Sequence, residues 1–263
     1  MIGAGAPDAA PAETERRVVL SAEGISKYYG NVTALDAVDL TIGEGEIVAL
    51  VGDNGAGKST MINLLNGIVQ PDEGTLRLDG EEIFIDSPRH AQEIGIATVF
   101  QDLALVNQRD VAANLFLGRE PRRFGIVVDR RRMVAEASKA VTRLRVGMPN
   151  VRALAGDLSG GQRQAVAVAR SIIRDCRVLL LDEPTAALGV RESRRVVEFV
   201  KELRAEGGMS ILLISHNMEH VFELADRVVV FRQGKKVGER VISETSMDEV
   251  VGLIVGNSFG TGA

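Results

Sequence analysis

Three short segments of the chain combine the glycine, lysine, hydroxyl and carboxylate residues that phosphate chemistry needs. The first runs Gly52, Asp53, Asn54, Gly55, Ala56, Gly57, Lys58, Ser59 and follows the pattern G-x-x-x-x-G-K-[ST]. Glycines let backbone N–H groups wrap closely around phosphate oxygens, and a helix that follows directs its positive end toward them. In such a loop Lys58 reaches the β- and γ-phosphates, and the Ser59 hydroxyl binds Mg²⁺. This segment therefore predicts a nucleotide-phosphate loop, and we count Thr60 among its contacts.

The second segment is an apolar run, 178–181, that ends in Asp182 and Glu183. A buried parallel strand delivers its last residues to the ligand-binding edge of an open α/β sheet, so both carboxylates are expected there. We predict that Asp182 holds Mg²⁺ through water and that Glu183 orients and deprotonates an attacking water, a step worth roughly 10²–10⁴-fold in rate. A carboxylate pair at a strand end is usually a solvated turn, but the phosphate loop favours catalysis here.

The third segment begins a helix whose residues 165–169 are apolar on nearly every side, which predicts a buried helix. Its first residues are Ser159, Gly160, Gly161 and Gln162, which follow Leu158. A serine and two glycines at a helix start make a second anion-binding site. One nucleotide seldom needs two such sites, so a second site calls for an explanation. The plainer alternative is an ordinary glycine-rich helix start.

In this order, the three segments resemble the ATPase subunit of an ATP-binding cassette (ABC) transporter, over roughly residues 18–256. The resemblance implies that the Ser159 loop closes on ATP held by the phosphate loop of a second copy. Two chains would then enclose two ATP molecules head to tail. It also implies that Gln101 contacts Mg²⁺ and the attacking water, that His216 contacts the γ-phosphate across the dimer, and that Tyr29 stacks on adenine.

Each of these single residues also has a plainer interpretation. Gln101 alone would be a loop residue, and Tyr29 would be an aromatic that packs on a small β lobe, with Tyr28 the neighbouring candidate for adenine. The other two histidines, His90 and His220, are predicted to lie on helix surfaces.

Short apolar runs that end in Gly or Asp alternate with helical patterns, which predicts an α/β fold with a parallel sheet flanked by helices. The resemblance makes this a P-loop NTPase (RecA-like) core with an N-terminal antiparallel β lobe and an inserted helical subdomain. The expected divisions are a disordered tail at 1–17, the ATPase domain at 18–256, and a tail at 257–263. Within that domain, 18–100 and 158–256 form the core with its β lobe, and 101–157 form the helical subdomain.

Hydrophobic periodicity and turn residues predict the individual elements. Strands are expected at 18–23, 38–42, 46–51, 96–100, 178–182, 210–215 and 227–231, with a hairpin over 76–83 centred on Asp79-Gly80. Helices are expected at 58–66, 191–205 and 217–225, after the caps Ser87 and Ser246, and after Asp129. No strand is expected between 101 and 157.

Composition narrows the class of protein. The net charge of −5 argues against a nucleic-acid partner. No apolar run approaches the ~18 residues that span a bilayer. Residues 1–12 lack the basic-then-apolar pattern of a signal peptide. Cys176, the single cysteine, excludes an internal disulfide and is expected to be a small buried residue. We therefore expect a soluble chain that meets a membrane through partners.

Four longer stretches, 99–105, 114–120, 182–193 and 215–218, resemble a narrower group, the importers of ribose-, xylose- and fructose-type sugars. Many of those ATPases fuse two cassettes, so the single copy here is similar to the fructose-type members. The resemblance implies a homodimer at the cytoplasmic face of the cell membrane, two polytopic permease subunits and an extracytoplasmic sugar-binding protein. Branched-chain amino-acid or lipid importers, a soluble cassette ATPase of the iron–sulfur assembly type and a non-hydrolysing nucleotide sensor remain alternatives.

Two features depart from, or add to, that resemblance. Gly189 stands where the family usually has Asp, which weakens any signalling role across the dimer at this position. Arginines cluster at 122–123 and 130–132. They are either a solvated face or a contact with a membrane subunit or anionic lipid headgroups.

Overall fold

The computed structural model describes residues 16–143, 150–173, 176–186, 188–205 and 207–256. Its centre is a six-stranded sheet in the order β12-β11-β3-β10-β9-β6. The strands are β3 (Ile47–Val51), β6 (Ile96–Val99), β9 (Val178–Asp182), β10 (Ser210–Ile214), β11 (Arg227–Arg232) and β12 (Lys235–Val241). All pair in parallel except β12, which runs antiparallel to β11. The predicted α/β P-loop NTPase core is confirmed.

Successive residues of each central strand pack on opposite faces of the sheet, as the strand period requires. Ala49, Leu181 and Leu213 belong to one apolar cluster, and Leu50 and Leu180 belong to the other. This two-sided burial explains why these strands are continuous apolar runs in the sequence. By contrast, β12 was not predicted, because Lys235–Val241 carries four charged residues and pairs on one edge alone.

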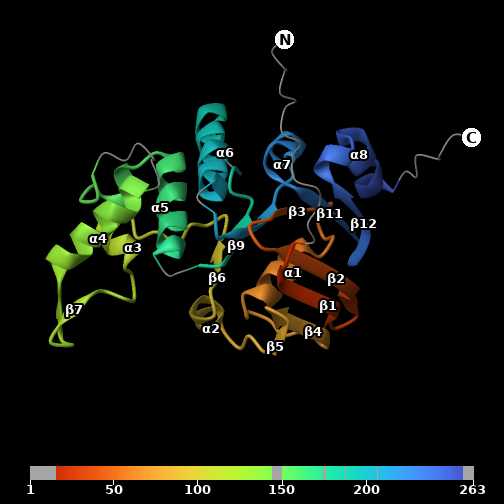
Figure 1. The fold of residues 1–263 in the computed structure, drawn as a ribbon, viewed down its shortest axis with the longest axis horizontal. Coiled ribbons are helices and arrows are strands. Elements are labelled where there is room, and N and C mark those ends of the chain that lie inside the picture. Colours follow the sequence, from red (N-terminus) through yellow and green to blue (C-terminus); the bar gives the residue numbers. More distant parts are fainter. Residues whose placement is uncertain (1–15, 144–149, 174–175, 187, 206, 257–263) are drawn as a thin grey trace, which may run out of the picture.

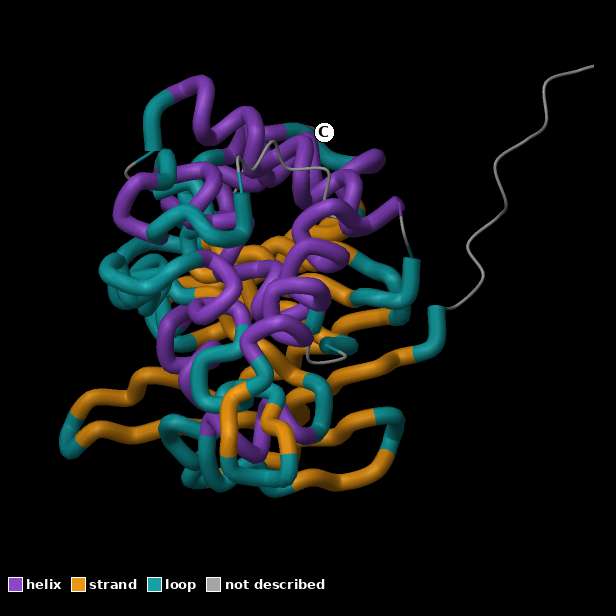
Figure 2. Tube along the Cα trace, turned by 90° about the vertical axis from the view of Figure 1, so that its left-hand side faces the viewer, coloured by secondary structure: helices purple, strands orange, loops and turns teal. Residues whose placement is uncertain are grey.

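Helices surround this sheet in both views (Figures 1 and 2). They are α1 (Lys58–Leu65), α2 (Pro88–Glu93), α5 (Gly160–Ile172), α6 (Val190–Ala205), α7 (Met218–Leu224) and α8 (Met247–Val255). Ser87, Asn217 and Ser246 cap α2, α7 and α8 through their side-chain oxygens. In the part of the chain that the structure describes, no helix has the length and apolar character needed to cross a membrane.

A second, antiparallel sheet lies beside the core and has the order β2-β1-β4-β5. Its strands are β1 (Val18–Tyr29), β2 (Val32–Gly43), β4 (Glu73–Leu78) and β5 (Glu81–Ile83). The predicted Asp79-Gly80 turn is present, with φ values of 53° and 84°. Both β1 and β2 are longer than expected, so their hairpin carries Tyr28 and Tyr29 to its end.

The helical lobe contains α3 (Val111–Leu115), α4 (Arg130–Arg143) and a 3₁₀ turn at Ala155–Asp157. Asp129 caps α4 as predicted, since its Oδ1 accepts from the Arg132 N–H at 3.1 Å. The expectation of no strand here was wrong, because β7 (Arg122–Arg123) and β8 (Val127–Val128) form a small hairpin. Two-residue strands are too short to give a periodic signal.

The predicted tails lie outside the described residues, except for the last two residues of the first. Those two residues contact the ATPase domain: Arg16 pairs with Asp226 at 3.1 Å and Arg17 with Asp79 at 3.2 Å. Cys176 is buried, and burial raises the pKa of its thiol to about 12. This agrees with its interpretation as a small buried residue.

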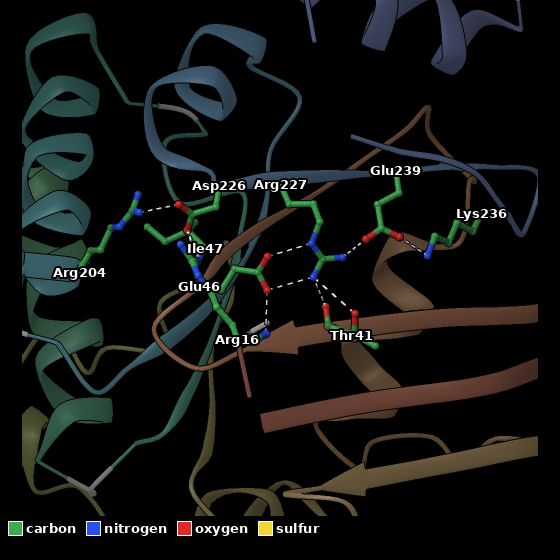
Figure 3. A network of polar contacts seen from close by, with 10 residues as sticks. Arg16, Thr41, Glu46, Ile47, Arg204, Asp226, Arg227, Lys236 and Glu239 are labelled. Carbon is green, nitrogen blue, oxygen red and sulfur yellow. Dashed lines mark hydrogen bonds and ion pairs between the residues drawn. The ribbon is translucent and has the colours of Figure 1, made fainter. Parts of the chain in front are cut away.

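A buried ion-pair network joins the β lobe to the core (Figure 3). The Arg227 guanidinium donates to both carboxylate oxygens of Glu46, at 2.9 and 3.0 Å, and to the Thr41 carbonyl at 2.8 Å. It also pairs with Glu239. Glu46 accepts in addition from the Gly43 N–H at 2.7 Å. One guanidinium therefore connects β11 and β12 with the end of β2.

Replacing Arg227 by Met should destabilise the protein strongly. Glu46 is 7% exposed and would keep a buried charge without its cation. Removing one partner of a buried pair costs about 3–5 kcal/mol. Urea denaturation would measure the loss. The matched control is Arg89→Met, which breaks a solvent-exposed pair with Glu93 and should change the stability very little. Equal losses in the two variants would contradict a structural role for Arg227.

Candidate functional site

The phosphate loop Gly52–Ser59 connects the end of β3 to the start of α1. Lys58 is the first residue of α1, and its Nζ donates to the carbonyl oxygens of Gly52 at 2.6 Å and Asp53 at 2.9 Å. These two hydrogen bonds hold the ammonium group against the loop that is predicted to bind phosphate. Ser59 is exposed and Thr60 is half-buried.

Two glycines of this loop have no room for a side chain. A Cβ on Gly52 would lie 2.2 Å from the Phe231 carbonyl oxygen, and one on Gly57 would lie 2.6 Å from the Ala34 carbonyl oxygen. Both also have positive φ, 150° and 105°. Gly55, at φ 79°, differs from them, since a Cβ there would meet no atom within 4 Å. The loop is thus packed tightly at its two ends and open at its tip, as a phosphate cradle must be.

Glu183 is held in a turn that begins where β9 ends. Its φ of 52° is unusual for a residue with a long side chain. Its N–H donates to the Ile214 carbonyl at 3.0 Å, and its own carbonyl accepts from the Ala186 N–H at 3.0 Å. This geometry places its Oε2 2.6 Å from Nδ1 of His216. The structure therefore brings two predicted catalytic residues into direct contact.

Lys58, Asp182 and Glu183 lie close enough to influence one another's ionisation. Burial lowers the pKa of Lys58, while the charges of Glu183, Asp53 and Asp182 oppose that shift. Burial also raises the pKa of Asp182, with a further rise from Glu183 and an opposing effect of Lys58. Charged groups held in a partly desolvated cluster are typical of functional sites.

His220 was predicted to lie on a helix surface, and it keeps part of its surface exposed. It is half-buried on α7, and its Nδ1 lies 3.2 Å from the Thr185 hydroxyl. Thr185 belongs to the turn that contains Glu183, so α7 contacts this turn through His220. His216 lies just before α7 in the chain. The sequence places His220 in the first turn of the helix that Asn217 caps. Its contact with Thr185 depends on the tertiary fold, which brings the two segments together. The other such histidine, His90, is part-exposed beside Asp86, at 3.3 Å.

Gln101 and Tyr29 are not in contact with this cluster in the described part of the chain. Gln101 is exposed, and the residues after it are fixed by Arg170 of α5, which donates to the carbonyls of Leu103 at 3.1 Å and Ala104 at 3.2 Å. Tyr29 is 46% exposed, and the Lys27 ammonium lies 5.7 Å from its ring centroid. Their roles therefore stay predictions.

The segment Ser159–Gln162 forms a reciprocal helix cap. The Ser159 N–H donates to Oε1 of Gln162 at 3.0 Å, and the Gln162 N–H donates to Oγ of Ser159 at 3.4 Å. Gly160 packs closely on Leu188, where a Cβ would lie 2.5 Å from a methyl group. In Figure 1, α5 lies between the helical lobe and the central sheet, apart from α1. The helix is buried over Ala165–Ala169, as predicted.

The predicted metal donors are Ser59, Gln101 and Asp182. A hydroxyl, an amide oxygen and a carboxylate are hard oxygen ligands of the kind that Mg²⁺ prefers. Within the described residues there is no group of three or more His, Cys, Asp or Glu that could hold a metal ion. Since Mg²⁺ is usually bound by one or two carboxylates together with substrate phosphates, these residues fit it.

At position 189, the glycine that departs from the family pattern has a local explanation. The Gly189 carbonyl accepts from the Ser193 N–H at 2.9 Å, at the start of α6. A Cβ there would lie 2.7 Å from Oε2 of Glu192. An aspartate would therefore place like charges side by side, which glycine avoids. The preceding Ala187 lies outside the described residues.

A family model described as "ABC transporter" matches residues 35–186. The fructose import ATP-binding protein FrcA of Rhizobium meliloti is 46% identical, over 90% of this chain and 94% of that relative. The xylose/arabinose import ATP-binding protein XylG of Sulfolobus acidocaldarius is 39% identical, over 92% of this chain and 96% of its own length.

Solved structures give the same fold. A nucleotide-free ATP-binding cassette from an ABC transporter superposes with a TM-score of 0.79, at 26% identity, over 90% of this chain and 98% of that one. A bacterial ABC transporter cassette solved as a dimer superposes with a TM-score of 0.71, at 24% identity, over 85% of this chain and 98% of that one.

Replacing Asp182 by Asn should stabilise the nucleotide-free chain at neutral pH. Because the pKa of Asp182 is raised on folding, folding disfavours its ionised form. The gain should stay under about 1 kcal/mol, since the carboxylate is partly solvated. It should shrink as the pH falls toward the ordinary value of 3.8, where the unfolded carboxyl is protonated too.

Denaturant melts at several pH values would check this expectation. Asp36→Asn is the control, because it removes an exposed carboxylate that pairs with Lys235 at 3.0 Å and should give no gain. A loss of stability in Asp182→Asn at neutral pH would show that the charge is already compensated in the free protein.

Proposed function

This chain belongs to the ABC transporter family, and we propose that it is the ATP-binding and ATP-hydrolysing subunit of a membrane importer for a monosaccharide of the ribose, xylose or fructose type. The observation that carries the proposal is the cluster at the carboxyl end of β9. There Lys58, Asp182, Glu183 and His216 lie together beside an open phosphate loop. The sugar class follows from the names of the fructose and xylose/arabinose import relatives.

In this proposal the loop residues bind the nucleotide phosphates through backbone N–H groups, and Lys58 neutralises the β- and γ-phosphates. Ser59, Asp182 and Gln101 would hold Mg²⁺, which neutralises phosphate charge when bound. The Glu183 carboxylate accepts a proton from water as the water oxygen bonds to the γ-phosphorus and the bond to the ADP oxygen breaks. His216 restrains that carboxylate through the 2.6 Å contact and would contact the γ-phosphate across the dimer. Tyr29 is assigned to the adenine.

We assign the Ser159 loop to the nucleotide of a second copy. Its glycines pack on Leu188 and on Glu192 of α6, and α5 lies apart from α1, whose first residue is the phosphate-loop lysine Lys58. A phosphate bound at this helix start would therefore come from another chain. A symmetric pair of chains would then enclose two nucleotides, and closure of the pair would drive the membrane subunits.

The proposed setting is the cytoplasmic face of the cell membrane. Two polytopic permease subunits would dock on the helical subdomain, 101–157, and an extracytoplasmic binding protein would deliver the sugar. The core with its β lobe, 18–100 and 158–256, would supply nucleotide binding and hydrolysis.

Lys58→Ala should abolish most of the affinity for ATP, because it removes the cation that neutralises the β- and γ-phosphates. A loss of at least about tenfold is expected from one charge-assisted contact. Equilibrium binding of a fluorescent ATP analogue would measure it. The control is Lys235→Ala, an exposed lysine at the start of β12, which should bind normally. Unchanged affinity in Lys58→Ala would contradict the phosphate-loop assignment.

Glu183→Gln should bind ATP but hydrolyse it roughly 10²–10⁴-fold more slowly, because the amide cannot take the proton from water. The slowed chain should accumulate as a dimer with ATP, visible by light scattering. Glu198→Gln, on the exposed face of α6, is the matched control. Rapid turnover in Glu183→Gln would rule out its role as the base.

Co-purification tests the transport part of the proposal. Tagged Glu183→Gln would be expressed in its native host, and membranes would be solubilised with ATP present. A polytopic membrane protein should co-purify, and its associated binding protein would identify the sugar. Recovery of soluble partners alone would contradict import and leave the ATPase assignment intact.

A further inference from the structure

The β7–β8 hairpin projects from the far end of the helical lobe (Figure 1). Its tip presents a group of apolar side chains to solvent: Phe124 is 98% exposed, Ile126 82% and Val127 62%. A single exposed apolar residue is ordinary, but neighbours that share one protruding tip mark an interaction surface.

The conformation of the tip argues that Phe124 is not there for folding. Phe124 and Gly125 have φ values of 54° and 74°, and the Ile126 N–H donates to the Arg123 carbonyl at 3.2 Å. Asn or Gly is preferred at the first of these turn positions, and a bulky aromatic is unfavourable there. The phenylalanine thus costs conformational energy and gains almost no burial in return. Such a residue is best explained by a contact outside the chain.

The segment that carries this tip is strongly basic, although the chain as a whole carries −5. Residues 119–132 include six arginines and two carboxylates, Glu120 and Asp129. Three of the arginines form ion pairs: Arg123 with Asp129, Arg130 with Asp110, and Arg132 with Glu136. Arg119, Arg122 and Arg131 form none in the described part of the chain, and all three are exposed.

We propose that the β7–β8 hairpin is a membrane-contact element that docks on anionic phospholipid headgroups. Phe124 and Ile126 would enter the interface between headgroups and acyl chains, and Arg119, Arg122 and Arg131 would bind lipid phosphates. Apolar tips flanked by arginines are the pattern of interfacial membrane binding. The arginines beside the apolar tip are complementary in charge to an anionic lipid surface, which is why lipid is the occupant proposed here. This contact goes beyond the proposed ATPase and uses none of its residues.

The test is co-sedimentation of the purified full chain with vesicles. We expect binding to vesicles of phosphatidylcholine mixed with phosphatidylglycerol, little binding to phosphatidylcholine alone, and release by salt. Arg122→Glu should weaken binding at least about fivefold, since each basic residue near such a surface contributes about that factor. Phe124→Ser combined with Ile126→Ser should weaken it further.

Two controls use exposed residues elsewhere. Phe84→Ser, beside β5, and Arg195→Glu, on α6, remove comparable side chains and should leave vesicle binding unchanged. ATP binding and thermal melting check that each variant is folded, and they also keep this test separate from the ATPase proposal. Absence of binding to the anionic vesicles, or equal binding by wild type and hairpin variants, would overturn the proposal. So would hairpin variants that keep vesicle binding but no longer co-purify with a membrane subunit, because the tip would then contact protein.

Discussion

The phosphate loop packs against the backbone of two different strands with no space for a side chain at Gly52 or Gly57. The position of the other site residues depends on this close packing. The Phe231 carbonyl of β11 closes one end of the loop, and Ala34 and Leu35 of β2 close the other. The loop is therefore shaped jointly by the parallel sheet and by the antiparallel lobe. Lys58 takes its position from that shape. A shift of either sheet would therefore move the loop that holds Lys58. The Arg227 network does not touch this loop, but it joins the two sheets that shape it.

Much of the core was predictable because its signals are local. Buried parallel strands such as β3 and β9 are apolar throughout, and the G-x-x-x-x-G-K-[ST] pattern fixes where a strand meets a helix. The elements that were missed have weak signals for physical reasons. The edge strand β12 is charged because one of its sides faces away from the sheet. The strands β7 and β8 are too short for any period, and α3 has five residues.

The residues of the site were predictable by type, but their contacts were not. Asp182 and Glu183 follow directly from the end of an apolar strand. The contact between Glu183 and His216 depends on a positive φ at Glu183, which no sequence pattern announces for a glutamate. The partner of His220 depends on the register between β9 and β10, because that register sets α7 against the Glu183 turn. Such contacts arise from tertiary structure.

Arg170 connects α5 to the loop that follows Gln101, a contact that the sequence alone does not predict. The same helix begins at the Ser159 cap and, three turns later, holds the carbonyls of Leu103 and Ala104 just after Gln101. This guanidinium is partly buried between α5 and the loop, and that burial lowers its pKa. In the proposed dimer, one end of α5 would meet the nucleotide of the partner and the other would hold the loop beside the chain's own. The helix would then link the two nucleotides, so that a shift of α5 at one site would also move the loop at the other.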